Sequence, residues 1–238
     1  MIDKTAKDAA EAVACIPNGA TVMVAGFGES GRPNTLLKAL LAAGATDLTI
    51  ISNNAGEGTH GMAGLLLAGR VSRLICSFPR GDMAAQTEKL VRAGALTLDV
   101  MPQGTLAERI RAGGCGVGAF YTPTSFGTDI AAGKETREID GKMHVLEYAL
   151  KADFALVKCR RGDRWGNLDY TLLSRNFAPL MCAAATHTIV EADVIVPLGA
   201  IDPEQVVTPG IFTDALVLTG SRTEPHDKAE PHDKEAAA

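Results

Sequence analysis

Short apolar runs alternate with longer segments whose apolar residues recur at helical spacing through the first half of the chain. The apolar runs rich in β-branched residues predict strands at 21–25, 48–52, 74–77 and 96–101. The helical spacing predicts helices at 4–15, 34–43, 61–68, 84–92 and 106–111. This order predicts an α/β fold, an open and mostly parallel sheet with helices on both faces.

Local signals refine the ends of these helices. Asn34 is predicted to cap the second helix, and Gly44 to end it. Thr105 and Glu108 have the spacing of a capping box, which predicts that the last of these helices begins at Leu106.

The pattern changes after Gly113. Asp140 and Gly141 separate two short β-like runs, which predicts a hairpin, and 153–159 and 188–191 are predicted strands. We therefore expect antiparallel additions to the sheet. No linker interrupts residues 1–220, so they are predicted to form one domain. The tail, 221–238, repeats Glu-Pro-His-Asp-Lys and is predicted to be disordered because it has too few apolar residues to form a core.

Composition excludes several classes of function. The chain is 46% apolar and 21% charged, as in compact soluble proteins, and its net charge of −5 argues against nucleic-acid binding. No apolar run approaches the roughly 20 residues that cross a membrane, and the first residues lack the apolar segment of a secretory signal. The five cysteines have no Cys-x-x-Cys spacing. We therefore expect a cytoplasmic protein without a metal site.

Gly26, Gly28 and Gly31 spell Gly-x-Gly-x-x-Gly after the first predicted strand, the arrangement of a dinucleotide-binding loop. Pro33 disfavours a helical conformation at Arg32, so the helix must begin later than in such loops. The next strand also lacks the terminal acid that would bind ribose. Two alternatives remain: a tight turn that needs glycine for steric reasons, or a loop whose backbone N–H groups bind a carboxylate or oxyanion.

Uncharged amides follow other predicted strands. Asn53 and Asn54 come after the second strand, and Gln103 comes after the fourth. The loop 113–128 combines glycines with three aromatic residues, a mixture typical of a loop that lines a ligand pocket. Structural roles, such as capping of neighbouring backbone, remain the alternative for each amide.

A nucleophile is harder to find. The sequence contains no Gly-x-Ser-x-Gly, Walker or His-Glu-x-x-His motif. Glu29 and Glu57 flank the glycine loops, but no activating partner is evident near either of them. The sequence therefore predicts a binding surface, half of an active site, without a catalytic residue.

In five blocks, the chain resembles the A (alpha) chain of the family I CoA-transferases. The resemblance extends from about residue 4 to 218, and the blocks that carry it are 26–36, 102–128, 152–167, 174–193 and 207–212. Gly118 and Ser125 depart from a common pattern of the family, in which Pro and Gly occupy these positions. The departures are expected to alter loop stiffness more than chemistry.

The resemblance implies transfer of CoA from an acyl-CoA to another carboxylic acid through a glutamyl-CoA thioester. In this family the nucleophilic glutamate lies in a Ser-Glu-Asn-Gly motif of the B subunit, and the motif is absent here. The resemblance therefore implies no catalytic residue in this chain and a B-subunit partner in a heterodimer or heterotetramer. No permanently bound cofactor is expected, because the CoA thioester is a substrate.

Matching positions imply which residues face the substrate. The implied substrate and oxyanion residues are Gly26, Phe27, Gly28, Asn53, Asn54, Gln103, Phe120, Tyr121 and Thr122.

The stretches 68–81 and 161–170 look closer to family members that use 3-oxoadipate than to those that use acetoacetate, the alternative. A bound dicarboxylate keeps a free carboxylate, and Arg32 and Arg80 are the candidates to pair with it. Sugar-phosphate isomerases of similar broad fold are a rival class, but they need basic groups near the glycine loops, where only Arg32 is close.

Overall fold

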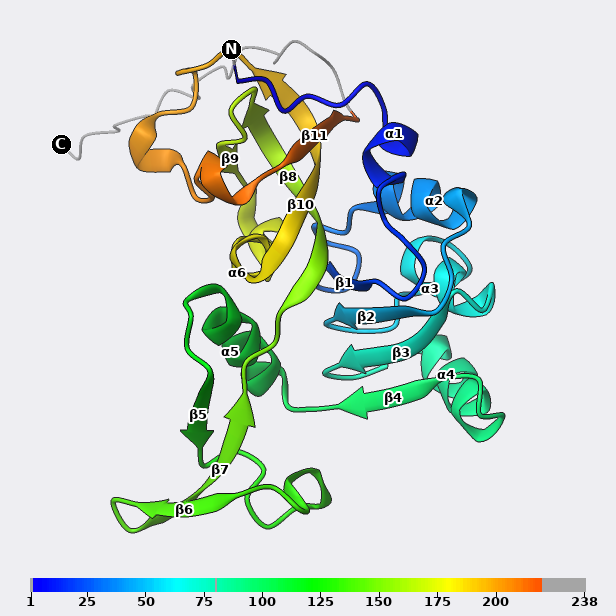
Figure 1. Cartoon of the computed structure of the whole chain (residues 1–238), viewed down its shortest axis with the longest axis vertical. Helices are drawn as coiled ribbons and strands as arrows, with labels where there is room; N and C mark the ends of the chain where they lie inside the picture. Colours follow the sequence, from blue (N-terminus) through cyan, green and yellow to red (C-terminus); the bar gives the residue numbers. More distant parts are fainter. Residues whose placement is uncertain (1, 80, 220–238) are drawn as a thin grey trace, which may run out of the picture.

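A computed structural model describes residues 2–79 and 81–219 of the chain. An eight-stranded sheet forms the body, and seven of its strands lie side by side in the order β11-β10-β8-β1-β2-β3-β4 (Figure 1). Every neighbouring pair on this path is parallel, and β9 pairs antiparallel with β8. The strands are β1 (Thr21–Val24), β2 (Leu48–Ser52), β3 (Val71–Cys76), β4 (Thr97–Val100), β8 (Ala152–Asp163), β9 (Leu168–Asp169), β10 (Ala185–Val196) and β11 (Ala215–Leu218). The predicted mostly parallel sheet is confirmed.

Helices cover both faces of this sheet, as predicted. Side chains alternate across a strand, so Val22 and Val24 of β1 pack in one apolar cluster while Met23 packs in the other. The first cluster lies under α1 (Ala9–Val13), α2 (Asn34–Ala43), α3 (Gly61–Leu67) and α4 (Asp82–Arg92). The second lies under α5 (Gln103–Gly114) and α6 (Ala178–Ala184).

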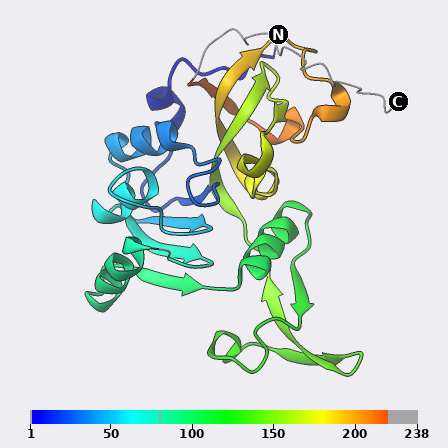
Figure 2. The same cartoon turned by 180° about the vertical axis from the view of Figure 1, so that it is seen from behind.

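A separate antiparallel sheet extends from the body in both views (Figures 1 and 2). Its order is β5-β7-β6, formed by β5 (Ala119–Thr122), β6 (Thr136–Ile139) and β7 (Lys142–Tyr148). Asp140 and Gly141 connect β6 to β7 with φ of 50° and 72°, the left-handed conformations that a two-residue hairpin turn of this kind needs. The predicted hairpin is therefore confirmed.

One predicted helix start and one predicted cap are wrong. The first helix begins at Ala9 rather than near residue 4, because Thr5 bridges Leu216 of β11 and Asp8 caps the helix by accepting from the Glu11 amide at 2.9 Å. Asn34 is the first residue of α2 and not its cap; Pro33 holds the cap position without a side-chain hydrogen bond.

The predicted capping box is also wrong. Pro102 is the N-cap of α5, and its carbonyl oxygen accepts from the Leu106 amide at 2.9 Å, so the helix begins at Gln103. Thr105 is consequently buried inside the first turn. The strands predicted at 153–159 and 188–191 are parts of β8 and β10, which have 12 residues each and pair with each other along most of that length.

The position of β1 in the sheet determines where a ligand is expected. From β1 the chain builds outward through β2, β3 and β4 on one side, and later through β8, β10 and β11 on the other. Open α/β sheets bind ligands beyond the carboxyl end of the strand at such a reversal. The glycine loop, which follows β1, lies there.

Two features are absent from the part of the chain that the structure describes. No helix there has the length and apolar character to cross a membrane. Nor do residues 2–79 and 81–219 bring together three or more His, Cys, Asp or Glu side chains that could hold a metal ion.

Candidate functional site

The loop after β1 is a tight turn in which all three glycines adopt positive φ. Gly26, Gly28 and Gly31 have φ of 134°, 60° and 68°, which other residues rarely adopt. Phe27 and Ser30 exchange backbone hydrogen bonds of 3.0 and 3.2 Å across the turn. The late helix start inferred from Pro33 is confirmed, and the spacing of the glycines therefore reflects backbone geometry rather than a dinucleotide fingerprint.

The turn fixes the direction of two backbone N–H groups. The Phe27 carbonyl points into the turn toward Ser30 N, so the Gly28 N–H in the same planar trans peptide points outward. The Gly28 carbonyl points at Arg32, so the Glu29 N–H points the opposite way. Gly26 N instead donates to Asn176 Oδ1 at 3.0 Å. Of the three predicted loop residues, Gly28 is thus the one whose amide is presented outward.

Arg32 lies inside the loop and not on the surface, with 2% of its area exposed. Its Nε and Nη2 donate to the Gly28 carbonyl at 3.1 and 2.7 Å, and Nη2 also donates to Asn54 Oδ1 at 2.7 Å. Burial lowers the pKa of the guanidinium, and the Glu29 carboxylate, 3.1 Å from Nε, opposes this shift. Arg32 therefore ties the glycine loop to the end of β2.

Three of the predicted amides meet at the carboxyl edge of the sheet. Asn53 Oδ1 accepts from Gln103 Nε2 at 2.7 Å and from Ser77 Oγ at 2.9 Å. Asn54 Oδ1 accepts from Arg32 and from the Gly56 amide at 2.9 Å. The ends of β2 and β3 and the start of α5 are thereby linked by neutral polar groups.

Two donors in this cluster remain unused by the protein. Arg32 Nη1 and Asn54 Nδ2 are buried, and neither contacts a hydrogen-bond acceptor in the described part of the chain. Buried donors in folded proteins almost always have a partner. An oxygen atom of a ligand or of water would supply one.

Phe120, Tyr121 and Thr122 lie on β5. Together with Gly104 and Thr105 they line a hollow of about 320 Å³ at the start of α5. Tyr121 donates its hydroxyl to Glu135, and the Arg137 guanidinium lies 4.9 Å from its ring centre. Gln103 adjoins this hollow through Gly104 and contacts Asn53 on its other side, so α5 connects the two groups of predicted residues.

Arg80 lies outside the described residues. Glu29 forms an ion pair with Arg32, so the guanidinium balances the charge of its carboxylate.

Three residues that contact this region were missed by sequence reasoning: Ser77, Asn176 and Glu191. An acid within the apolar run 188–196 was the available signal for Glu191. Ser77 and Asn176 had no comparable local signal.

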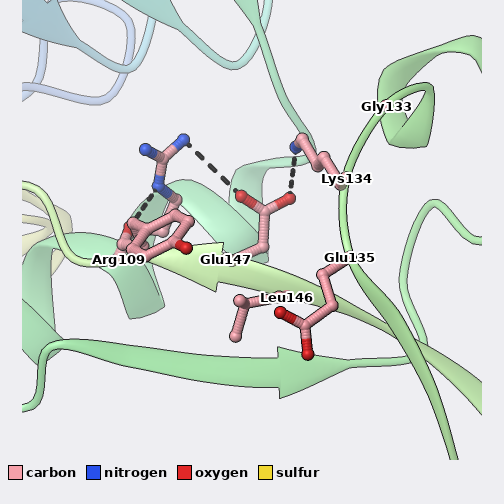
Figure 3. Close-up of a pocket in the computed structure, with 7 residues that line it drawn as sticks. Arg109, Gly133, Lys134, Glu135, Leu146 and Glu147 are labelled. Atoms are coloured by element: carbon pink, nitrogen blue, oxygen red, sulfur yellow. Dashed lines mark hydrogen bonds and ion pairs between the residues drawn. The ribbon is translucent and has the colours of Figure 1, made fainter.

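A second polar cluster joins α5 to the three-stranded sheet (Figure 3). Glu147, 2% exposed, points one carboxylate oxygen at Lys134 Nζ, 2.5 Å away, and the other at Arg109 Nη1, 3.6 Å away. Arg109 Nε also donates to the Tyr148 carbonyl at 2.6 Å. Burial lowers the pKa of Arg109, and Glu147 opposes this shift. Both carboxylate oxygens therefore have cationic partners.

Comparisons with known proteins agree with this architecture. The coenzyme A transferase family matches residues 6–219. The alpha chain of the 3-oxoadipate CoA-transferase of Pseudomonas putida is 55% identical over 217 residues, 91% of this chain and 94% of that protein. Human mitochondrial succinyl-CoA:3-ketoacid coenzyme A transferase 2 is 42% identical across 96% of this chain but only 47% of that protein.

A solved acyl-CoA transferase from Escherichia coli O157:H7 has the same fold, with a TM-score of 0.80 and 21% identity over 92% of this chain and 48% of that one. This chain thus spans about half the length of the human and Escherichia coli proteins, and nearly the whole of the Pseudomonas protein. The family match covers almost all of the described residues, and this chain belongs to the coenzyme A transferase family.

Proposed function

We propose that this chain is the alpha chain of a cytoplasmic two-subunit CoA-transferase that moves CoA from succinyl-CoA to 3-oxoadipate. The observation that carries the proposal is the cluster of Gly28, Arg32, Asn54 and Gln103 at the sheet reversal, which offers donors but no activated nucleophile. The name of the Pseudomonas putida protein, which is 55% identical, supports 3-oxoadipate as a substrate, and the name of the human relative supports succinyl-CoA. The partner is a B subunit, in a heterodimer or heterotetramer.

The division of chemistry follows from this assignment. The B subunit supplies a glutamate carboxylate that attacks the thioester carbonyl, the C–S bond breaks, and the CoA thiolate leaves an acyl-glutamyl anhydride. The thiolate then attacks the glutamyl carbonyl, which releases succinate and leaves a glutamyl-CoA thioester. The carboxylate of 3-oxoadipate reverses the two steps. No permanently bound cofactor is needed.

The residues of this chain would bind and orient the acyl groups. Each attack places negative charge on a carbonyl oxygen, and prearranged donors stabilise that charge. The outward amide of Gly28 and the side-chain amides of Asn54 and Gln103 are donors of this kind. Because they are neutral, they stabilise a developing oxyanion without pairing permanently with the carboxylate nucleophile.

Succinyl-CoA:acetoacetate transfer is the second candidate, because the name of the human relative gives a 3-ketoacid as the acceptor and acetoacetate is another acid of that class. 3-Oxoadipate differs from acetoacetate by a terminal carboxymethyl group and therefore carries a second carboxylate. Arg32 Nη1, which has no acceptor in the described chain, favours the acid with the additional carboxylate, and Arg80 is the other candidate for this contact.

Reconstitution tests the proposal. The purified chain is mixed with succinyl-CoA and a candidate B subunit, and formation of a new thioester is followed with 3-oxoadipate or acetoacetate. We expect turnover only with both proteins present, and faster turnover of 3-oxoadipate. Much faster turnover of acetoacetate would contradict the substrate assignment. Activity of this chain alone on ribose 5-phosphate, or saturable binding of NADH to it, would instead support the rival classes.

A further inference from the structure

Two polar side chains from the β8–β10 half of the sheet hold the loop that belongs to the β1–β4 half. Asn176 follows the short 3-10 helix η2 (Leu172–Arg175), and Glu191 lies on β10. Neither residue has a role in the function proposed above. Both contact backbone groups at the ends of the segment 26–36.

Asn176 holds the first part of the loop with both ends of its amide. Its Oδ1 accepts from Gly26 N at 3.0 Å and from Phe177 N at 2.7 Å. Its Nδ2 donates to the Ser30 carbonyl at 3.1 Å and to the Ser174 carbonyl at 3.0 Å. One side chain therefore fixes the loop both before and after the outward amides of Gly28 and Glu29.

Gly31 packs so closely against Ser174 and Asn176 that no side chain fits at this position. A Cβ at Gly31 would lie 2.3 Å from the Ser174 carbonyl oxygen and 2.6 Å from Asn176 Nδ2. Asn176 itself has φ 22° and ψ −119°, a conformation that favours glycine. Backbone strain of this kind persists only where surrounding contacts impose it. The asparagine is thus held in place for its side chain, at a position where glycine would suit the backbone better.

Glu191 holds the other end of the segment. Its Oε2 accepts from the Thr35 amide at 2.8 Å and the Leu36 amide at 3.2 Å, in the first turn of α2. The N-cap residue of α2, Pro33, makes no side-chain hydrogen bond to these amides. Lys158 Nζ lies 3.7 Å from Glu191 Oε1 and 3.0 Å from Asp193 Oδ1, so the buried carboxylate also has a cationic neighbour. A carboxylate from a distant strand therefore caps α2.

We propose that Asn176 and Glu191 are positioning residues that fix both ends of the loop 26–36 and thereby aim the N–H groups of Gly28 and Glu29 at the acyl carbonyl. The inference rests on the proposed function for its catalytic part. Arg32 contributes from inside the loop. It donates a hydrogen bond to the Gly28 carbonyl, which fixes the plane of the peptide that carries the Glu29 N–H. Catalytic donors need such preorganisation, since misplacement by about 1 Å can cost about 100-fold in rate.

Asn176→Gly is the most direct test, because glycine tolerates the backbone conformation and the variant loses only the side chain. Asn167→Gly is the matched control: Asn167 also clamps a turn, accepting from Gly210 N and donating to Asp163, both at 2.9 Å. Amide hydrogen exchange of the isolated chain is measured first, since it needs neither partner nor activity. We expect exchange in 26–31 to accelerate about tenfold or more in Asn176→Gly, as for a locally opened segment. In the control it should not.

Kinetics of the reconstituted enzyme give the second measurement. We expect kcat of Asn176→Gly to fall about 100-fold while KM for succinyl-CoA changes little, because the donors are misaimed rather than removed. Glu191→Ala should lower kcat, and Glu191→Gln should recover most of it, because the amide oxygen can still accept from Thr35 N and Leu36 N.

The outcomes separate the two proposals. Unchanged exchange in 26–31, or a kcat equal to that of Asn167→Gly, overturns the positioning role. Faster exchange with wild-type kcat shows a purely structural clamp and also overturns it. If the wild-type proteins show no transferase turnover, the proposed function fails together with the catalytic part of this inference, while exchange still decides whether the two side chains hold the loop.

Discussion

Two arginine clusters in this molecule differ in how far the protein itself satisfies the hydrogen bonding of their buried polar groups. At the base of the three-stranded sheet, both oxygens of Glu147 have a cationic partner, Lys134 or Arg109 (Figure 3). At the end of β1, Arg32 is almost fully buried, yet its Nη1 and the neighbouring Asn54 Nδ2 have no acceptor among the described residues.

The difference separates a structural cluster from a candidate binding surface. An ion cluster whose buried carboxylate is paired through both oxygens stabilises the arrangement of the elements that it joins. A buried cluster with unused donors is destabilising by itself, because each unpaired polar group costs about 1–3 kcal/mol. Such a cluster is expected where a ligand completes the hydrogen bonding. Four sets of variants test this contrast.

Glu147→Ala should have the largest effect on stability and little effect on turnover. The substitution leaves Arg109 and Lys134 without their carboxylate partner. We expect the free energy of unfolding to fall by about 2–3 kcal/mol. This is less than for a fully buried pair, because both cations keep some contact with solvent. Urea unfolding of the isolated chain measures this, with the exposed Glu88→Ala as the control. A large loss of kcat per folded enzyme would show that the Glu147 cluster takes part in the reaction.

Arg32→Lys should act mainly on turnover. A lysine cannot reproduce the fork that donates to Gly28 and Asn54, so the loop amides lose their alignment. We expect kcat to fall about 100-fold, equivalent to about 2.7 kcal/mol, with the two proteins still assembled. Kinetics of the reconstituted enzyme measure the change, and the surface variant Arg73→Lys serves as control. A kcat within twofold of wild type would remove Arg32 from the site.

Gln103→Ala should lower kcat about tenfold. This effect is smaller than that of removing an essential oxyanion donor, because the amides of Asn53 and Asn54 remain. The exposed Gln86→Ala on α4 is the matched control. Assembly, measured by size-exclusion chromatography, should be the same for both variants. Equal turnover of the two would assign Gln103 a purely structural contact with Asn53.

The smallest effect concerns pH. Burial raises the pKa of Glu191 above its ordinary value of 4.5, although the amides of Leu36 and Thr35 and the charge of Lys158 oppose the shift. The folded state therefore holds this proton more tightly, and its contribution to stability falls as pH rises from about 4.5 through the raised pKa. Glu191→Gln should flatten the dependence of Tm on pH in that window. Identical slopes for variant and wild type would contradict the shift.

Sequence reasoning succeeded where a feature depends on neighbouring residues. Pro33 placed the start of α2, and Asp140 with Gly141 placed the hairpin, because both act through local backbone sterics. The capping-box prediction at Thr105 failed because Pro102, already suited to the cap position by its own geometry, starts the helix three residues earlier than predicted.

The contacts that shape the site lay beyond such local signals. Asn176 is 150 residues from Gly26, and Glu191 is 156 residues from Thr35. The pairing of β1 with β8 and of β8 with β10 brings them together, and no periodicity in the sequence encodes that register. The predicted amides met at one edge because β2 and β4, the strands that they follow, run parallel in one sheet with only β3 between them. The predictions for Arg80 and the tail at 221–238 lie outside the described residues.

Trapping of the covalent intermediate tests the central claim, that this chain presents donors while the second protein of the enzyme supplies the nucleophile. The reconstituted enzyme is incubated with succinyl-CoA alone, and the site of CoA attachment is located by mass spectrometry of the separated proteins. We expect the thioester on a glutamate of the B subunit, with none on this chain. A thioester on Glu29 or Glu57 of this chain would contradict the account.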